Sequence, residues 1–371
     1  MSDDPLELSV TPLAECHRRL GARMVPFSGW EMPVQYPEGI LAEHHHTRRH
    51  VSLFDICHMG EFRITGPDVA GALDRIFPRP VANQPIGVCR YNFLLTEAGT
   101  VIDDLIIYRL AENEFYIVVN AGTREGDAAC LRERLPAGIA FRDESATTAK
   151  LDLQGPESAT VLAALGLPTA SLPGYYRWCH AEIDTLPVLL SRTGYTGELG
   201  FELYFAADAA ERLWNRLLAI DPVKPAGLGA RDTLRLEMGY PLYGHEMDVH
   251  TTPIEAGFGA LIPLADESRS FYGAKALRNS PPRRRLTGIE LDGRRAARTD
   301  ATVLRAGEKI GKICSGTFSP SLEKAVALAY IDAAFVLPTG TEVELEAGRQ
   351  ILPGRTAELP FYREGSVRAK L

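Results

Sequence analysis

Two stretches of the chain repeat the same order of apolar and polar positions. Residues 62–73 and 151–162 each begin with the alternation of a half-buried strand and end with the spacing of an amphipathic helix. In each stretch, a glycine, a proline and an acidic residue separate the strand pattern from the helix pattern. Pro67 and Pro156 suit the first helical position, and an acid is favourable at the positive end of a helix dipole. The pattern therefore predicts strand, turn and helix twice.

A hairpin of similar outline follows each of these units. Residues 94–108 and 189–203 both hold two apolar runs around a glycine-containing turn, with Asp103, Asp104 and Glu202 at comparable places. Further elements then follow: a strand and a helix at 115–119 and 124–135, and a helix near 207–218. We interpret the whole as an internal duplication of an α+β unit, a ferredoxin-like α/β sandwich.

Residues after about 280 show a different pattern. Residues 280–285 read Ser-Pro-Pro-Arg-Arg-Arg, which is typical of a solvated linker because paired prolines resist helix and charges resist burial. Short alternating runs follow between glycine- and proline-rich turns: Leu286–Leu291, Lys309–Cys314, Ala325–Tyr330 and Glu342–Leu345. This predicts a small antiparallel β domain, either a barrel or a sandwich.

Length and charge limit the possible classes of protein. A chain of 371 residues is long enough for two or three domains. Its net charge of −8 offers no general positive field for nucleic acid, and no apolar run approaches the roughly 18–20 residues that span a membrane. The six cysteines are far apart, which indicates reduced thiols. Since the N-terminus lacks a signal or transit pattern, we expect a cytoplasmic protein.

A glycine-rich loop between two apolar runs is the strongest functional signal. Residues 193–202 read Thr-Gly-Tyr-Thr-Gly-Glu-Leu-Gly-Phe-Glu. The glycines permit backbone angles closed to other residues, while Tyr195 and Glu202 supply a flat face and a hydrogen-bond acceptor. Such a unit suits a flat heterocycle. A glutamate after Phe201 in a strand can also simply face water, and this alternative stays open.

Two adjacent acids interrupt the apolar strand at residues 101–108. Neighbouring residues of a strand point to opposite faces, so either Asp103 or Asp104 should face inward. A buried aspartate is unfavourable unless it is paired or hydrogen-bonded, which favours a functional site. An edge strand bordering solvent would instead give both acids an ordinary exposed position.

Four histidines lie within residues 43–50. His46 and His50 have the i, i+4 spacing of paired metal ligands on a helix. A third ligand is missing, and a solvated helix face explains the run as well. We therefore expect no metal site. Without a phosphate-binding Gly-x-x-x-x-Gly-Lys or Gly-x-Gly-x-x-Gly pattern, we expect no nucleotide cofactor either.

Four blocks, in this order along the chain, resemble the aminomethyltransferase family, the T-protein of the glycine cleavage system. They are residues 101–105, 193–202, 229–237 and 242–248, and the resemblance runs from Thr11 to Tyr362. It implies three lobes around a central folate hole. The implied lobes are a first domain at 1–52 and 148–275, a second domain inserted at 53–147, and a C-terminal β domain at 280–371.

The resemblance also assigns roles to individual residues. It implies that Asp104 is the catalytic carboxylate, and that Glu202 and Arg231 contact folate through a bidentate acceptor and a planar donor. Other residues implied to line the folate pocket are Tyr91, Asn120, Tyr195, Tyr240 and, near the C-terminus, Tyr362. Each of these has a simpler alternative as a half-buried tyrosine, a strand-end turn residue or, for Tyr362, an edge-strand tyrosine.

The implied reaction moves a methylene group to tetrahydrofolate from an aminomethyl group on the dihydrolipoyl arm of a carrier protein, the H-protein. The products are 5,10-methylene-tetrahydrofolate, ammonia and the dihydrolipoyl carrier. Two alternatives stay open: a folate-dependent demethylase of a small sulfur or oxygen compound, and a non-enzymatic folate-binding protein of iron–sulfur cluster maturation. The acid at Asp104 disfavours the first, and the absence of cysteine from residues 193–198 disfavours the second.

An acidic carrier would need a local basic patch on this acidic chain. The sequence offers two candidates. One combines Arg283–Arg285 with Arg294 and Arg295, and the other consists of Arg48 and Arg49.

Overall fold

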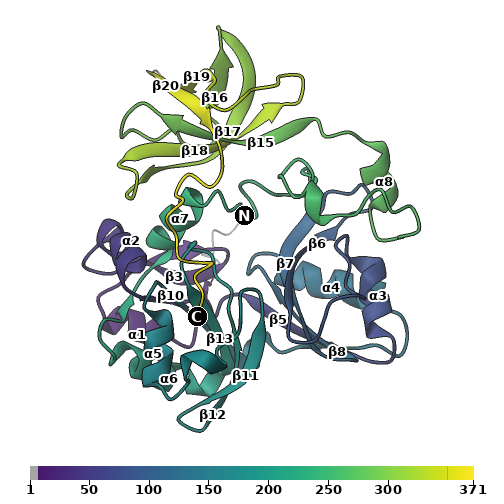
Figure 1. Ribbon diagram of the computed structural model, residues 1–371, viewed down its shortest axis with the longest axis vertical. Helices are drawn as coiled ribbons and strands as arrows, with labels where there is room; N and C mark the ends of the chain where they lie inside the picture. The colour runs from purple at the N-terminus through teal and green to yellow at the C-terminus, as the bar shows by residue number, and fades with distance from the viewer. Residues whose placement is uncertain (1–6, 349) are drawn as a thin grey trace.

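The computed structural model describes residues 7–348 and 350–371. Three bodies meet near the middle of the molecule: a six-stranded sheet with its helices at the lower left of Figure 1, a five-stranded sheet at the right, and a closed barrel at the top. This mixed α+β architecture with a C-terminal barrel confirms the predicted fold class. No helix among the described residues is long and apolar enough to cross a membrane.

The six-stranded sheet joins parts of the chain that are distant in sequence. Its order is β11 (Trp178–Ile183), β12 (Leu186–Ser191), β13 (Gly200–Ala206), β10 (Thr148–Gln154), β4 (Ser52–Asp55) and β14 (Lys224–Pro225). The helices of this part are α1 (Ala14–Arg19), α2 (Ile40–Arg49), α5 (Ser158–Ala164), α6 (Ala210–Leu218) and α7 (Leu228–Glu237). A small sheet lies beside them, formed by β1 (Ser9–Val10), β3 (Trp30–Gln35) and β2 (Arg23–Phe27).

One face of the six-stranded sheet packs against helices, and the other does not. Leu151, Leu153 and Leu203 point toward α5 and α6, where they form a core with residues such as Trp214 and Val161. Because side chains alternate along a strand, the residues between them point to the opposite face. These are Lys150, Asp152 and Glu202, and all three are nevertheless buried.

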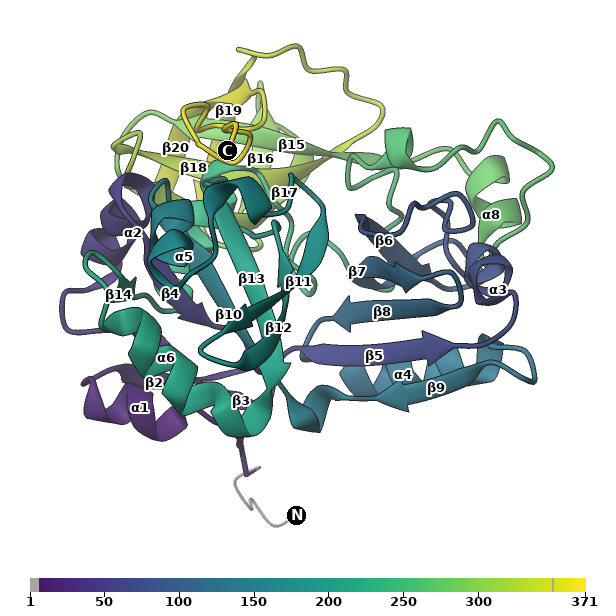
Figure 2. The same cartoon turned by 60° about the horizontal axis from the view of Figure 1, so that its bottom comes forward.

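The five-stranded sheet has the order β6 (Cys89–Leu95), β7 (Val101–Ala111), β8 (Glu114–Val119), β5 (Gly60–Thr65) and β9 (Ala140–Asp143). Helices α3 (Val69–Ile76) and α4 (Arg124–Arg134) cover one face, where Leu105 and Ile107 pack with Leu131. The two sheets lie side by side in Figure 2. Tyr108, on the other face, joins the six-stranded sheet through a contact of its hydroxyl with that of Tyr204 at 2.8 Å. The helix-free faces of both sheets therefore meet each other.

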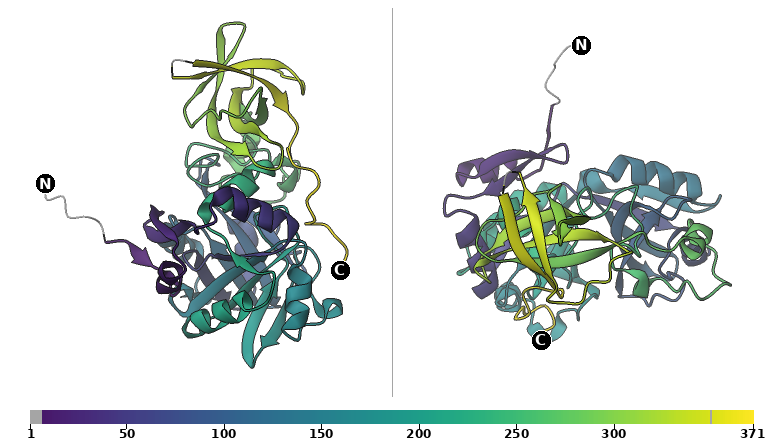
Figure 3. Two further views of the ribbon diagram at one scale, coloured as in Figure 1. Left: turned by 90° about the vertical axis from the view of Figure 1, so that its left-hand side faces the viewer. Right: turned by 90° about the horizontal axis from the view of Figure 1, so that it is seen from above.

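The barrel is closed in the order β15 (Arg284–Leu291), β18 (Lys324–Asp332), β17 (Glu308–Ser319), β16 (Thr302–Arg305), β19 (Glu342–Ala347) and β20 (Gln350–Ala357). It stands above the two sheets (Figure 3). The prediction of an antiparallel β domain is confirmed, although the sequence pattern did not indicate β16 and β20. Helix α8 (Ala274–Asn279) precedes the barrel, and short 3₁₀ turns lie at Ser145–Thr147, Thr169–Ser171, Ala207–Ala209 and Gly259–Leu261.

Three local predictions are wrong. Helices α3 and α5 begin at Val69 and Ser158, two residues after the prolines that were expected to open them. In the first turn Asp68 adopts a left-handed conformation with φ 50°, so the chain bends once more before the helix starts. The predicted linker ends early as well, because Arg284 and Arg285 already belong to β15.

The C-terminal segment returns from the barrel to the six-stranded sheet, as its yellow trace shows in Figure 1. The backbone N–H of Tyr362 donates to the carbonyl of Glu237 at 2.9 Å, and that of Val367 donates to the carbonyl of Gly197 at 3.1 Å. Tyr362 lies outside any strand, so the edge-strand alternative for it is wrong. The last residues thus contact the glycine-rich loop at 193–202.

Candidate functional site

Asp104 lies on the helix-free face of the five-stranded sheet, where two neighbours hold its carboxylate. Tyr91 donates its hydroxyl to Oδ2 at 2.9 Å, and Asn120 donates Nδ2 to Oδ1 at 3.0 Å. Tyr91 belongs to the adjacent strand β6, and Asn120 follows the end of β8. The structure therefore brings together three of the residues predicted for the site.

The pKa of Asp104 lies close to neutrality. Burial raises it and a charge on Asp103 raises it further, while the hydrogen bonds from Tyr91 and Asn120 lower it, with a result of about 7. A carboxyl group with such a pKa exchanges a proton easily at neutral pH. Asp103 points to the opposite, helix-covered face and is 0% exposed, which confirms the prediction that one of the two acids faces inward.

Glu202 is buried between the two sheets, so the water-facing alternative is wrong. Its Oε2 accepts hydrogen bonds from the hydroxyls of Thr193, of Tyr204 at 3.2 Å and of Tyr108 at 3.5 Å. Its Oε1 lies 3.4 Å from Nζ of Lys150. Burial alone would raise the pKa of Glu202, but Lys150 and Thr193 hold it below its ordinary value. Glu202 is therefore an ionised, fixed acceptor.

Arg231 projects from α7 beside Tyr195 of the glycine-rich loop. Its Nη1 donates to Oδ2 of Asp152 at 2.7 Å, and its guanidinium lies 4.9 Å from the ring centroid of Tyr195. The ring of Tyr240 stacks on that of Tyr195, with centroids 5.8 Å apart and an interplanar angle of 25°. These residues form a flat aromatic wall with a planar cation on it, next to the buried Asp152.

The two groups of predicted residues belong to one region. Glu202 accepts a hydrogen bond at 3.5 Å from the hydroxyl of Tyr108, whose side chain lies on the same face of β7 as that of Asp104. Asp152 stands directly opposite Glu202 in the pairing of β10 with β13, which places the partner of Arg231 beside Glu202. The region combines a carboxyl group with a pKa of about 7, that of Asp104, with the ionised acceptor Glu202. It also contains the planar donor Arg231 and the aromatic faces of Tyr195 and Tyr240.

Tyr362 contacts a different set of residues. The guanidinium of Arg48 lies 4.3 Å from its ring centroid, and Arg48 also forms ion pairs at 2.8 Å with both Glu198 and Glu237. The guanidinium of Arg48 is thus already paired inside the protein, so its assignment to a carrier-binding patch is wrong. Tyr362 therefore packs on this network of charged side chains. The network lies beside the glycine-rich loop, since Glu198 belongs to that loop.

The histidine run on α2 serves packing rather than forming a solvated face. Glu43, His44, Thr47 and Arg48 are buried, which contradicts that alternative. His44 Nδ1 bonds to the hydroxyl of Thr233 at 2.8 Å. His46 Nε2 lies 2.8 Å from the carbonyl oxygen of Pro222. Among the residues that the structure describes, no group of three or more histidine, cysteine or acidic side chains is placed to hold a metal ion.

The sequence reasoning missed Lys150 and Asp152. Residues 148–154 read Thr-Ala-Lys-Leu-Asp-Leu-Gln, an alternation that normally marks a half-buried strand with its polar side in water. Here the polar side faces the second sheet, and both side chains are at most 1% exposed. The clue available in the sequence was the duplication, since a second sheet must have a partner to pack against.

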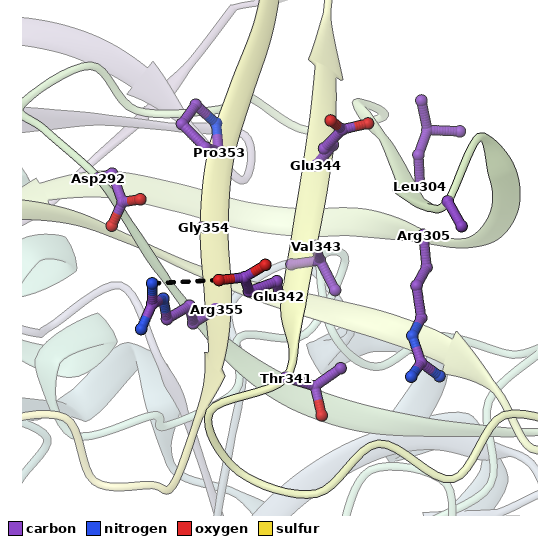
Figure 4. A pocket seen from close by; sticks show the side chains of 11 residues that line it. Asp292, Leu304, Arg305, Thr341, Glu342, Val343, Glu344, Pro353, Gly354 and Arg355 are labelled. Atoms are coloured by element: carbon purple, nitrogen blue, oxygen red, sulfur yellow. Dashed lines mark hydrogen bonds and ion pairs between the residues drawn. The ribbon is translucent and has the colours of Figure 1, made fainter.

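A surface hollow of about 600 Å³ lies elsewhere, on the outside of the barrel (Figure 4). It is lined mainly by β19, β20 and the β16–β17 turn, and Glu342 and Arg355 form an ion pair at 3.2 Å on its wall. Its lining contains none of the residues predicted for the site. The candidate site therefore lies at the junction of the two sheets, away from this hollow.

Two family models match the chain. The GCVT N-terminal domain matches residues 13–266, and the glycine cleavage T-protein C-terminal barrel domain matches residues 284–363. The first covers both sheets and every predicted site residue except Tyr362, and the second covers the barrel. Fold, site and models together define the class of protein, a group transferase of the T-protein type.

Individual relatives agree with this class. Proteins named aminomethyltransferase from Symbiobacterium thermophilum and Rubrobacter xylanophilus are 42% and 44% identical to the chain, over 96% and 95% of it and 98% and 94% of their own lengths. The crystal structure of the glycine cleavage system aminomethyltransferase T from Bartonella henselae has a TM-score of 0.91 at 37% identity, covering 97% of this chain and 99% of that one. The chain belongs to the aminomethyltransferase family of the glycine cleavage system.

Proposed function

We propose that this aminomethyltransferase takes the methylene of an aminomethyl group, carried as a thioether-like adduct on the dihydrolipoyl arm of a carrier protein, and transfers it to tetrahydrofolate. The carbon–sulfur and carbon–nitrogen bonds of the adduct break, and two bonds to folate nitrogens form. Two protons leave those nitrogens, one ending on the departing ammonia and one on the carrier thiol. No oxidant or reductant is required.

The observation that carries the proposal is the position of Asp104 with its two donors. Tyr91 and Asn120 fix the orientation of the carboxylate, and its pKa of about 7 lets it accept a proton and release it again. In the proposed reaction the ionised Asp104 orients the reacting nitrogen and takes up its proton. The same group can then supply that proton to a departing group.

The residues around Asp104 fit a folate. Tetrahydrofolate, when bound, supplies the nitrogen nucleophiles of the reaction. Glu202 is ionised and has one oxygen, Oε1, whose contact with Lys150 is as long as 3.4 Å, so this oxygen can accept from a polar ring edge. Arg231 with the stacked Tyr195 and Tyr240 offers a planar donor and an aromatic face.

We also propose that the lobes divide as the resemblance implies, with residues 1–52 and 148–275, 53–147 and 280–371. Each part contains one of the three main β structures, although β4 continues to Asp55 within the six-stranded sheet. Such a division puts the site between two lobes, which protects an electrophilic methylene from water. Limited proteolysis should cut first between these parts.

An omission assay tests the proposed reaction. Ammonia release from an aminomethylated lipoyl carrier should require the enzyme, the carrier and tetrahydrofolate together. Release that is equally fast without tetrahydrofolate would contradict the proposal. Demethylation of a small methylated sulfur compound, in place of ammonia release from the carrier, would instead support the demethylase alternative.

A further inference from the structure

The C-terminal strap, residues 365–369, lies directly against the glycine-rich loop. The backbone N–H of Val367 donates to the carbonyl oxygen of Gly197 at 3.1 Å. A Cβ atom on Gly365 would stand 2.3 Å from the same carbonyl oxygen, so only glycine allows this close approach of the two backbones. The strap belongs to no helix or strand, and its contacts with the loop therefore hold it in place.

Ser366 connects the strap with the buried carboxylate of Glu198 in the loop. Oε2 of Glu198 accepts hydrogen bonds from the hydroxyl of Ser366 and from its backbone N–H, the latter at 2.9 Å. The hydroxyl oxygen of Ser366 in turn accepts from the backbone N–H of Leu199 at 2.9 Å. On the other side, Oε1 of Glu198 accepts from Nη1 of Arg48 at 2.8 Å. Because Glu198 is buried, each of its oxygens needs such donors, and the strap supplies those of Oε2.

Arg192 attaches the strap to the other end of the loop. This arginine is buried, and its Nη2 donates to the carbonyl oxygens of Val367 at 3.1 Å and of Ala369 at 2.5 Å. Arg192 directly precedes the loop, whereas the other contacts of the strap follow Tyr195 in the sequence. The strap is therefore bonded to the chain on both sides of Tyr195.

Tyr195 is the part of the loop that the proposed folate site uses. Its ring stacks on that of Tyr240 and lies beside the guanidinium of Arg231. Its hydroxyl donates to the carbonyl oxygen of Pro241. The loop contains Gly197 with φ 82°, and a glycine leaves its backbone free to adopt other conformations. The direction of the Tyr195 ring therefore depends on contacts that fix the loop backbone on both sides of it.

We propose that the strap holds the glycine-rich loop in its folate-binding form, and that Ser366 is a positioning residue which acts through Glu198 and Tyr195. The inference rests on the proposed function, because the ring of Tyr195 belongs to the folate site there. With the strap released, the loop populates forms in which Tyr195 no longer stacks on Tyr240, and only the fraction with an ordered loop binds folate. Bound folate reorders the loop, so the transfer step keeps its rate.

Two variants release the strap in different ways. Ser366→Ala removes the hydroxyl and keeps the backbone N–H. In the ammonia-release assay at saturating carrier, the KM for tetrahydrofolate should rise about 3- to 10-fold while kcat changes less than about twofold, since a hydrogen bond to a charged group contributes about 10-fold or more. Gly365→Ala should raise the KM in the same way, because its Cβ pushes the strap away from Gly197. The double variant should be little worse than either single variant, since both changes release the same strap.

The matched control is Ser268→Ala. The hydroxyl of Ser268 also donates to a carboxylate, that of Asp266 at 2.6 Å, but in an exposed turn that precedes α8. We expect its KM and kcat to equal those of the wild type. A serine that only supports the fold would lower the melting temperature of Ser366→Ala without raising the KM. That result, or a fall of kcat at an unchanged KM, would overturn the inference.

Amide hydrogen exchange without folate tests the strap independently of activity. In Ser366→Ala and Gly365→Ala, residues 194–199 should exchange faster than in the wild type, while the central strand β10 should exchange at its wild-type rate. Equal exchange of the loop in the wild type and both variants would overturn the inference. A wild type without transfer activity, together with faster loop exchange in both variants, would contradict the proposed function alone.

Discussion

Replacing Lys150 by methionine would isolate the contribution of one buried charge to the site. Lys150 is 1% exposed, and its Nζ lies 3.4 Å from Glu202 Oε1, 3.5 Å from Met59 Sδ and 5.0 Å from the ring centroid of Tyr204. Methionine keeps the apolar stem and removes the charge. Glu202 would then be buried with its hydroxyl donors but without its main cationic partner.

The expected loss of stability follows from this geometry. Breaking a buried ion pair by removing one partner destabilises a protein by about 3–5 kcal/mol, and we expect about 3 kcal/mol here because Arg231 still acts on Glu202. Glu61, which also lies near Lys150, adds little to this loss of stability. Burial raises its pKa to about 8, so it is mainly uncharged at neutral pH.

The sign of the pH dependence is a stricter test than the size of the effect. In the wild type the lowered pKa of Glu202 stabilises the fold above the pKa of the unfolded chain, and this stabilisation is lost as the pH falls through the folded value. In Lys150→Met burial dominates and raises the pKa of Glu202. The variant is then penalised increasingly as the pH rises, so its deficit should be larger at pH 8 than at pH 5.

Melting temperatures of the wild type, Lys150→Met, Glu202→Gln and the double variant would measure this. At pH 8 we expect Lys150→Met to melt about 5–10 °C below the wild type. The double variant should recover most of that loss, because glutamine leaves no unpaired charge. If Lys150→Met melted like the wild type at pH 8, or if Glu202→Gln failed to rescue it, the ion pair would not hold Glu202 as described.

Three further predictions follow from the site. Glu202→Gln should weaken tetrahydrofolate binding about 5- to 150-fold in calorimetry, since an unpaired buried polar contact costs about 1–3 kcal/mol, and an unchanged affinity would remove Glu202 from the folate site. The transfer rate should rise with pH through the pKa of Asp104, about 7, because the ionised form accepts the proton; a rate independent of pH between 6 and 8 would contradict this role. Charge reversal at the exposed Arg283 and Arg285 should raise the carrier KM, as should added salt, and leave folate affinity unchanged; a KM insensitive to both would place the docking surface elsewhere.

The sequence predicted the elements whose pattern is local. Both hairpins, the strand at 115–119 and the helix at 124–135 appear within a few residues of their expected positions, because alternation and helical spacing depend on neighbouring residues. The closed barrel was predicted as a class, but β16 has only four residues, too few to give a clear alternating pattern. The start of α3 was wrong because a left-handed Asp68 is a turn geometry that proline statistics do not indicate.

The contacts between distant segments could not be predicted. Lys150 and Asp152 occupy positions that look solvent-facing in their own strand, and only the second sheet buries them. Arg48 looked like part of a basic surface patch, yet Glu198 and Glu237, which are 150 and 189 residues further along the chain, neutralise it. The roles of Glu202 and Arg231 as folate ligands rest on the family resemblance and stay predictions.

The central claim is that Asp104 moves the proton in the transfer, and ammonia release by Asp104→Asn tests it most directly. With tetrahydrofolate and an aminomethylated lipoyl carrier present, this variant should release ammonia about 10²-fold more slowly than the wild type while it still folds and binds folate. Asp103→Asn should lose less. An Asp104→Asn enzyme as active as the wild type, or equal losses in the two variants, would contradict the account.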